Sequence, residues 1–195
     1  AIGKPKGAFV IAGGIGRTNA AAATTAAILS DGPFTWVISA GIAGALPNSG
    51  LSLGSTVIAS ACVYAEEGLA TPNGFKDMKQ MGFSLGNFEG NNVPVDPWML
   101  GRCNTLGIVG QIATVATCSG TDEQADTVKE RTGCICEAME GAAVVHAAMR
   151  VGAPAIELRT ISNTTGNREQ QEWNISLALE NLGSTVRNAI PSLYG

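Results

Sequence analysis

The hydrophobic positions of this chain fall into two kinds of stretch that alternate along the sequence. One kind is short and rich in β-branched residues, which is typical of strands buried inside a sheet. The other kind is longer and either alanine-rich or apolar on one face, which predicts helices. Predicted strands span residues 7–13, 35–40, 54–65, 107–117, 133–137 and 154–161, and predicted helices span 18–30, 122–132, 139–150 and 174–190.

This alternation of strands and helices predicts an α/β fold. We expect three layers, with a mostly parallel or mixed central sheet flanked by helices, because parallel strands need connections that cover both faces. Residues 66–101 carry many turn residues and few periodic signals, so they are expected to form an elaborated loop with short helical pieces. No linker or internal repeat divides the sequence, and residues 1–195 are expected to form a single domain.

Composition and charge narrow the classes of function. Hydrophobic residues make up 45% of the chain and charged residues 14%, enough to bury one substantial core. The net charge of −4 and an aromatic content of 5% argue against a nucleic-acid partner. No apolar run is long enough for a membrane span and no secretory signal opens the sequence, so we expect a cytoplasmic protein without a membrane partner. Small-molecule chemistry is the better expectation.

The cysteine and histidine content bears on metals and redox state. The chain has five scattered cysteines and one histidine. An odd number of scattered cysteines in a chain of this size favours reduced thiols over a disulfide framework. A single histidine leaves too few ligands for a zinc site. We therefore expect neither a metal nor a cofactor.

Two short segments carry the strongest chemical signal. Residues 137–141 (EAMEG) open a predicted helix, residues 159–163 (RTISN) end a predicted strand, and Glu140 and Asn163 stand 23 residues apart. We expect both at neighbouring carboxyl-end loops of one sheet, where open α/β sheets bind ligands. A carboxylate accepts from two ribose hydroxyls, and a carboxamide offers the donor and acceptor that a 6-oxopurine needs. Taken singly, each residue has a simpler structural explanation: Glu140 as an exposed acid of a first helical turn, and Asn163 as a turn cap.

Together with the AGIAG sequence at 40–44, these segments resemble the nucleoside phosphorylase and nucleosidase superfamily over nearly the whole chain. The resemblance implies a phosphorylase/hydrolase-like sheet and a purine nucleoside as the small-molecule partner. It also implies that Glu140 and Asn163 are catalytic, that Glu140 holds the ribose hydroxyls, that Met139 packs on the sugar, and that Asn163 contacts the purine near N7. The other expected substrate-binding residues are Ile42, Ala43, Gly44, Thr121, Ser162 and Arg168.

Within the superfamily the chain is most similar to futalosine hydrolases. The similarity lies in YAEEGL at 64–69, TPNGF at 71–75, GNR at 166–168 and WN at 173–174. Those enzymes split futalosine into hypoxanthine and dehypoxanthine futalosine in menaquinone biosynthesis. Arg168 is the expected contact for the benzoate carboxylate of futalosine, because a guanidinium suits carboxylate recognition.

Two departures separate the alternatives within the superfamily. Hexameric phosphorylases place an arginine and a serine, which clamp phosphate, where this chain has Ser39 and Ile42. Adenine-releasing nucleosidases have an aspartate at the position of Asn163, and that acid protonates the leaving purine, which an amide does not do. Hydrolysis of a hypoxanthine nucleoside is favoured. The alternatives are a methylthioadenosine/S-adenosylhomocysteine-type nucleosidase, a purine nucleoside phosphorylase, and a non-catalytic nucleoside-binding protein on the same fold.

The group that activates water is not evident in the sequence. The resemblance implies a water-activating glutamate on the family's first strand, and this chain is expected to start after that strand. The alternatives are that the N-terminal segment was lost, that hydrolysis is impaired, or that Glu66, Glu67 or another acid substitutes. His146 follows Glu140 by six residues on one predicted helix, about 240° around its axis, and is expected to be structural. Arg159 is expected to pair with an internal carboxylate. The resemblance also implies a homo-oligomer, either a dimer or a tetramer.

Overall fold

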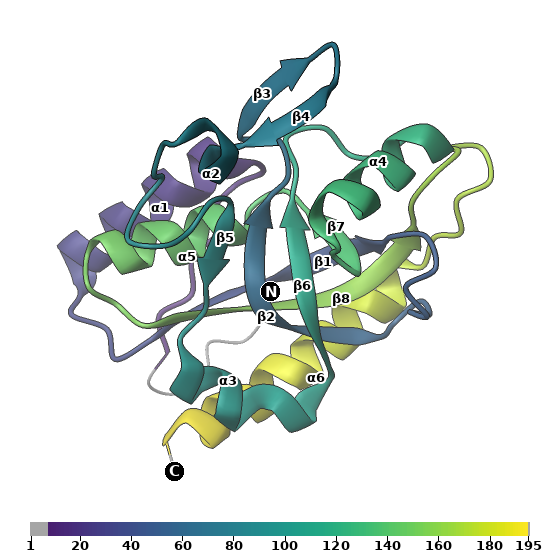
Figure 1. Ribbon diagram of the computed structural model, residues 1–195. Coiled ribbons are helices and arrows are strands. Elements are labelled where there is room, and N and C mark those ends of the chain that lie inside the picture. The colour runs from purple at the N-terminus through teal and green to yellow at the C-terminus, as the bar shows by residue number, and fades with distance from the viewer. Residues whose placement is uncertain (1–7, 195) are drawn as a thin grey trace.

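A computed structural model describes residues 8–194 of the chain and places a mixed six-stranded sheet at its centre (Figure 1). The strand order is β5, β2, β6, β7, β1, β8, and β8 also pairs with β2, so the sheet curls back on itself. The strands are β1 (Val37–Ala45), β2 (Thr56–Tyr64), β5 (Asn92–Pro94), β6 (Ile108–Thr114), β7 (Cys136–Ala138) and β8 (Ala155–Thr164).

The sheet contains parallel and antiparallel pairs in about equal measure. Strand β6 runs parallel to β2 and β7, and β1 runs parallel to β8. The pairs of β1 with β7, of β2 with β5, and of β2 with β8 are antiparallel. The predicted α/β fold with a mixed central sheet flanked by helices is confirmed.

Helices cover the sheet on two sides. Helix α1 packs against α5 on one side, and α6 packs on β8 and β1, with α3 beside it, on the other. The short elements of residues 66–106 include a small hairpin of β3 with β4. The helices are α1 (Arg17–Asp31), α2 (Met78–Met81), α3 (Pro97–Cys103), the 3₁₀ turn η1 (Asn104–Leu106), α4 (Asp122–Thr132), α5 (Gly141–Arg150) and α6 (Ile175–Tyr194); β3 is Gly68–Thr71 and β4 is Gly74–Asp77.

Strand β8 is the most deeply buried element and carries unusual chemistry. Its first nine residues are all buried. Apolar side chains such as Ile156, Leu158 and Ile161 account for only part of this strand, and the others include a carboxylate, a guanidinium and a carboxamide. Buried polar groups are costly unless they are paired, so these side chains must find partners inside the fold.

The helix predictions agree with the structure more closely than the strand predictions. The helix predicted at 122–132 is α4, and the helices predicted at 18–30, 139–150 and 174–190 are α1, α5 and α6 with slightly shifted ends. Thr121 caps α4 with its side chain, and Gly133 ends it in a left-handed conformation with a φ of 68°. Both signals are local, which explains the agreement.

The strand predicted at 7–13 is wrong for residues 8–13, which are irregular, while residue 7 lies outside the described part of the chain. Phe9, Val10 and Ile11 are each 44–49% exposed, and no described strand pairs with them. A β-branched run becomes a strand only when a neighbour supplies ladder hydrogen bonds. Within residues 8–194, no helix has both the length and the apolar character needed to cross a membrane.

Candidate active site

The two segments singled out in the sequence meet across β1. Gly44 of β1 pairs with Glu137 of β7 on one side and with Asn163 of β8 on the other. The expectation of a shared carboxyl edge is wrong, because β7 runs antiparallel to β1 while β8 runs parallel to it. The strands are nevertheless neighbours of the same strand, which places a carboxylate segment and a carboxamide segment on either side of β1.

Glu140 occupies the N-cap position of α5 and is half-buried, with its side chain 21% exposed. Its Oε1 accepts from the backbone N–H of Gly16 at 3.1 Å, and its Oε2 lies 3.2 Å from Nη1 of Arg159. A carboxylate has about four acceptor positions, so these two contacts fix the group and leave positions for ligand hydroxyls. The arrangement suits bidentate recognition of a diol.

Arg159 is the cation that holds this carboxylate from beneath. Its side chain is 4% exposed, and its Nε donates to Oε1 of Glu157 at 2.7 Å. The other nitrogens approach Glu140, the carbonyl of Ile42 at 3.4 Å and the hydroxyl of Ser39 at 3.4 Å. Burial lowers the pKa of Arg159, but the charges of Glu157 and Glu140 outweigh it and raise the pKa above its usual value.

The predicted pairing of Arg159 with an internal carboxylate is confirmed, and Glu157 is the partner. Sequence reasoning missed the second ion pair with Glu140 and the backbone contact of Glu140 with Gly16. The sequence did contain a signal for the pair of Arg159 with Glu157, because residues two apart on a strand face the same way. No comparable spacing links Arg159 to Glu140, which is on another element.

Asn163 lies near the end of β8 and is 9% exposed. Its Oδ1 accepts from the hydroxyl of Ser162 at 2.8 Å, and its Nδ2 donates to the carbonyl of Thr164 at 2.8 Å. Ser162 also donates to the carbonyl of Ala43 at 3.2 Å. These contacts orient the carboxamide and leave one of its two amide hydrogens free for a ligand acceptor.

The AGIAG sequence at 40–44 is part of strand β1, which extends beyond the strand predicted at 35–40. Ile42, Ala43 and Gly44 lie within β1 and pair with β8. The pairing slips by one residue between Ala43 and Gly44, which gives β8 an extra residue at Ser162. Such a bulge bends the strand and redirects its side chains, which is common beside active sites. A Cβ on Gly44 would lie 2.8 Å from Cγ2 of Thr165 and 3.1 Å from Nδ2 of Asn163, so glycine makes room for both side chains.

Met139 is half-buried and packs against a second apolar cluster, separate from the main core. It directly precedes Glu140 in the sequence. The buried members of that cluster are Leu46, Val63, Ala65, Ala113, Val115, Val128 and Cys134.

Thr121 and Arg168 lie in two exposed loops that touch one another. The side chain of Thr121 accepts from the N–H of Gln124 at 3.2 Å, so its hydroxyl already serves as a helix cap. The backbone N–H of Arg168 donates to the carbonyl of Gly120 at 3.0 Å. The structure therefore brings the two predicted binding loops together.

Gln171 and Glu137 fasten these loops to the sheet. The side chain of Gln171 donates to the carbonyl of Ser119 at 3.0 Å, and Ser119 donates to buried Glu137 through its N–H at 2.7 Å and its hydroxyl at 2.6 Å. The guanidinium of Arg168 lies 4.5 Å above the ring of Trp173, whose backbone pairs with Asn163. Arg168 is thus held near Asn163 but is exposed to solvent.

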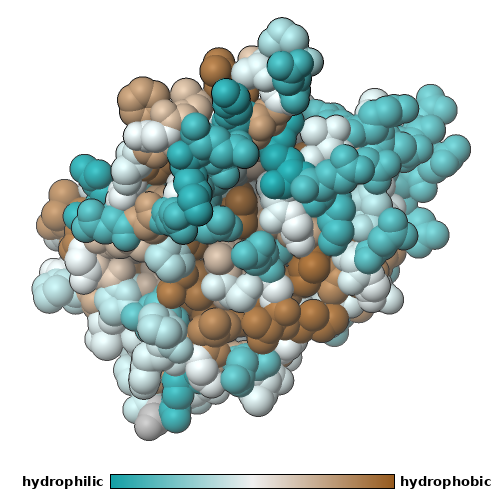
Figure 2. Space-filling model, viewed as in Figure 1, coloured by the Kyte–Doolittle hydropathy of each residue, from teal (hydrophilic) through white to brown (hydrophobic). Residues whose placement is uncertain are grey.

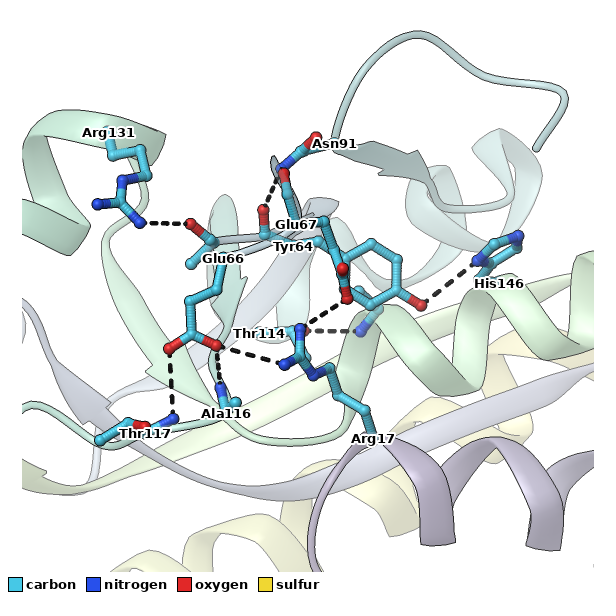
Figure 3. A network of polar contacts seen from close by, with 12 residues as sticks. Arg17, Tyr64, Glu66, Glu67, Asn91, Thr114, Ala116, Thr117, Arg131 and His146 are labelled. Carbon is cyan, nitrogen blue, oxygen red and sulfur yellow. Dashed lines mark hydrogen bonds and ion pairs between the residues drawn. The ribbon is translucent and has the colours of Figure 1, made fainter. Parts of the chain in front are cut away.

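Figure 3 shows a second polar cluster, built around Arg17, Glu66 and Glu67. Arg17, the first residue of α1 and the neighbour of Gly16, reaches Glu67 at 2.8 Å and Glu66 at 3.4 Å. Glu66 also accepts from the N–H groups of Ala116 at 2.5 Å and Thr117 at 3.3 Å. Glu66 is therefore occupied as an acceptor, whereas Arg17 is the one charged partner of Glu67 among residues 8–194. The assignment of either acid as a substitute base stays a prediction.

His146 lies at the edge of this network, beside Tyr64 (Figure 3). Its Nδ1 is 3.3 Å from the hydroxyl of Tyr64, and its ring meets that of Phe88 edge-on at 5.0 Å. Burial first, and the charge of Arg150 second, lower the pKa of His146, so the imidazole is neutral at pH 7. These contacts agree with the structural role expected for it.

Two concavities lie elsewhere on the protein. One of about 250 Å³ is lined by His146 and residues of the loop and helix around it, and the other of about 220 Å³ lies against α6. Neither is lined by Glu140 or Asn163, so the candidate site rests on side-chain chemistry. Residues 8–194 contain no group of three histidine, cysteine, aspartate or glutamate side chains arranged to hold a metal ion.

Comparison with known proteins identifies the family. The model of the Phosphorylase superfamily matches residues 2–191. The chain belongs to this superfamily. A futalosine hydrolase from Streptomyces coelicolor is 35% identical over 195 residues, which is 97% of this chain and 81% of that protein. A futalosine hydrolase from Thermus thermophilus is 36% identical over 184 residues, or 91% of this chain and 78% of that protein. A third, from Acidothermus cellulolyticus, is 37% identical over 153 residues, which is 76% of this chain and less than two thirds (62%) of that relative.

Solved structures agree on the fold of this superfamily member. A methylthioadenosine/S-adenosylhomocysteine nucleosidase from Colwellia psychrerythraea in complex with adenine has a TM-score of 0.75 at 22% identity, covering 93% of this chain and 76% of that one. The native futalosine hydrolase of Helicobacter pylori has a TM-score of 0.74 at 18% identity, covering 92% and 77%. Since both identities are low, these structures support the fold alone.

Proposed function

We propose that this protein hydrolyses the N-glycosidic bond of futalosine and releases hypoxanthine and dehypoxanthine futalosine, a step of menaquinone biosynthesis. The observation that carries the proposal is the oriented carboxamide of Asn163 across β1 from the Glu140 segment. An amide at this position suits a 6-oxopurine, and the curated relatives of 35–37% identity are futalosine hydrolases.

Glu140 binds the ribose and stabilises the transition state in this proposal. As the glycosidic bond lengthens, positive charge develops on the sugar ring. A fixed carboxylate that accepts from the 2′-hydroxyl stabilises this charge without having to reorganise. Gly16 and Arg159 supply the fixing contacts. Met139 packs beneath the sugar, and the β1 residues Ile42, Ala43 and Gly44 line the same side.

Asn163 recognises the base. Its free amide hydrogen donates to N7 or O6 of hypoxanthine, while Ser162 keeps the amide in the orientation that this requires. The amide does not protonate the purine, so the proton that the leaving base needs comes through water. Thr121 lines the base site with its loop, and exposed Arg168 pairs with the benzoate carboxylate of futalosine.

We also assign the protein to the cytoplasm as a homo-oligomer, either a dimer or a tetramer. Figure 2 shows hydrophobic surface gathered across the lower half of one face, near the start of β6, where Ile108 and Val109 are 48% and 45% exposed. Exposed apolar surface of this kind is typical of subunit contacts. Light scattering on the purified protein measures the subunit number directly.

A panel of nucleosides tests the proposed function. The protein is incubated separately with futalosine, inosine and methylthioadenosine, and the released base is identified by mass spectrometry. We expect hypoxanthine from futalosine at the highest kcat/KM. Faster release of adenine from methylthioadenosine would instead identify an adenine nucleosidase, and binding of hypoxanthine without turnover of any substrate would identify a nucleoside-binding protein.

A further inference from the structure

Glu157 is a fully buried carboxylate for which the proposed reaction gives no direct use. It is 0% exposed and lies two residues before Arg159 on β8. Its Oε1 accepts from Nε of Arg159 at 2.7 Å, whereas its Oε2 accepts no hydrogen bond that meets the usual geometry within residues 8–194. The Cys62 thiol is a polar neighbour, and its pKa is raised well above the usual value by burial and then by Glu157. Burying a carboxylate in the core is costly, so the presence of Glu157 there needs an explanation.

The helix that presents Glu140 is shaped around Glu157. A Cβ on Gly141, the first residue of α5, would overlap the carboxylate of Glu157. Gly141 does not have a positive φ, so its backbone conformation does not call for glycine. Space is the remaining reason: Gly141 lets the Glu157 carboxylate lie directly against the residue that follows Glu140.

The guanidinium between the two carboxylates is confined in the same way. A Cβ on Gly41 of β1 would overlap Nη1 of Arg159, the atom that contacts Glu140. Glycines on two different elements thus make room for the chain of charges that runs from Glu157 through Arg159 to Glu140. The chain begins in the core and ends at the half-buried carboxylate.

The charges of Glu157, Arg159 and Glu140 do not cancel, and the net negative charge has a chemical use. Arg159 carries one positive charge between two carboxylates. Glu157 contacts Nε of Arg159 and balances the positive charge of the guanidinium from the core side. The group of Glu157, Arg159 and Glu140 therefore has a net negative charge beside the proposed ribose site. Without the charge of Glu157, the charges of Arg159 and Glu140 would cancel, and the site would lose its net negative charge.

The geometry points to Glu157 as a positioning residue that acts through Arg159 to hold the ribose-binding carboxylate of Glu140 in place and to leave the group of Glu157, Arg159 and Glu140 with a net negative charge. This inference rests on the proposed function, because it assigns the charge of Glu140 to the positively charged sugar of the transition state. Glu157 is thereby expected to affect kcat, the rate of the chemical step, rather than the affinity for substrate.

Kinetics of Glu157→Gln and Glu157→Asp test the role. The glutamine variant is near-isosteric and still accepts from Nε of Arg159, yet it lacks the charge. We expect its kcat for futalosine to fall about tenfold or more, with KM and the Kd for hypoxanthine changing less than about twofold. Glu157→Asp keeps the charge and should recover part of the loss. Glu180→Gln, a charge change at an exposed position of α6, is the matched control and should leave kcat unchanged.

A steric test checks the packing that the inference needs. Gly141→Ala should lower the free energy of unfolding, because the new methyl group meets the Glu157 carboxylate. In a Glu157→Val background the same change should be much less destabilising, because the collision is gone. Equal effects of Gly141→Ala in both backgrounds would overturn the placement of Glu157.

The outcomes separate this inference from the proposed function. If the parent protein cleaves futalosine and Glu157→Gln has the parent kcat, the positioning role is wrong and the function stands. A glutamine variant that loses only stability, with kcat unchanged for the folded fraction, would also overturn it. If the parent protein cleaves none of the nucleosides, the proposed function fails, and the positioning role fails with it.

Discussion

Nη1 of Arg159 lies 3.2 Å from Oε2 of Glu140, which joins the most buried strand of the sheet to the first turn of α5. The two side chains differ in burial, at 4% and 21% exposed. A pair of this kind contributes less to stability than a contact between opposite charges suggests, because both groups lose hydration. Its clearest consequence is geometric: the ion pair helps to hold the Glu140 carboxylate in one orientation.

Removal of the charge of Glu140 should abolish most of the activity. Glu140→Gln keeps the size of the side chain but stabilises positive charge on the ribose poorly. We expect kcat for hypoxanthine release from futalosine to fall about 10²-fold or more, as for the loss of one preorganised electrostatic contact. Release is followed by chromatography, with circular dichroism to confirm folding. The parent rate in this variant would exclude Glu140 from catalysis.

Replacement of Asn163 by aspartate should change the preferred base. Ser162 would still donate to Oδ1, but the second carboxylate oxygen would face the carbonyl of Thr164 in place of an amide donor. Two facing acceptors favour the protonated acid, which can then donate its proton to a leaving adenine. We expect kcat/KM for methylthioadenosine relative to futalosine to rise at least about tenfold. An unchanged ratio would count against Asn163 as the base reader.

Loss of the Arg168 side chain should raise KM for futalosine and leave KM unchanged for nucleosides without a carboxylate. Arg168→Ala removes the guanidinium that lies over Trp173 and donates to Gln171. We expect KM for futalosine to rise about tenfold, the size of one charge-assisted hydrogen bond, while KM for inosine stays constant. Arg187→Ala, at an exposed position on α6, serves as the control. Equal changes for both substrates would point to a loop defect instead.

Glu137 should make stability depend on pH. Burial first raises the pKa of Glu137 above its ordinary 4.5, against the hydrogen bonds from Ser119, which lower it. A raised folded-state pKa means that the favourable contribution is complete below pH 4.5 and is lost as pH rises through the folded pKa. Relative to the parent, Glu137→Gln should therefore be more stable at pH 7.5 than at about pH 4, by urea unfolding. The opposite trend would show that its hydrogen bonds outweigh burial.

The sequence predicted the features that depend on neighbouring residues and missed those that depend on distant ones. The bounds of α4 follow from a capping threonine and a terminal glycine. Arg159 was expected to pair with an internal carboxylate, which the structure identifies as Glu157, two residues away on the same strand. The antiparallel course of β7 depends on how the sheet curls. The contact between Arg159 and Glu140 depends on how α5 sits over β8, which no local pattern encodes.

Residues 8–13 also show that local composition is not enough to predict a strand. The segment has the composition of a strand, and its apolar side chains are nearly half exposed. Composition alone does not create a strand, since the ladder of hydrogen bonds requires a partner. The position of Glu66 was likewise hidden, because its acceptors are filled by backbone groups about 50 residues away.

This member of the phosphorylase superfamily is expected to use water rather than phosphate as the second substrate. Where a phosphorylase would place its clamp, Ser39 is buried against Arg159, and Ile42 offers no side-chain donor. The most direct measurement is the rate of hypoxanthine release from futalosine with and without inorganic phosphate, with the sugar product identified by mass. We expect the same rate in both conditions and dehypoxanthine futalosine as the product. A rate that requires phosphate, with a sugar phosphate as the product, would contradict this account.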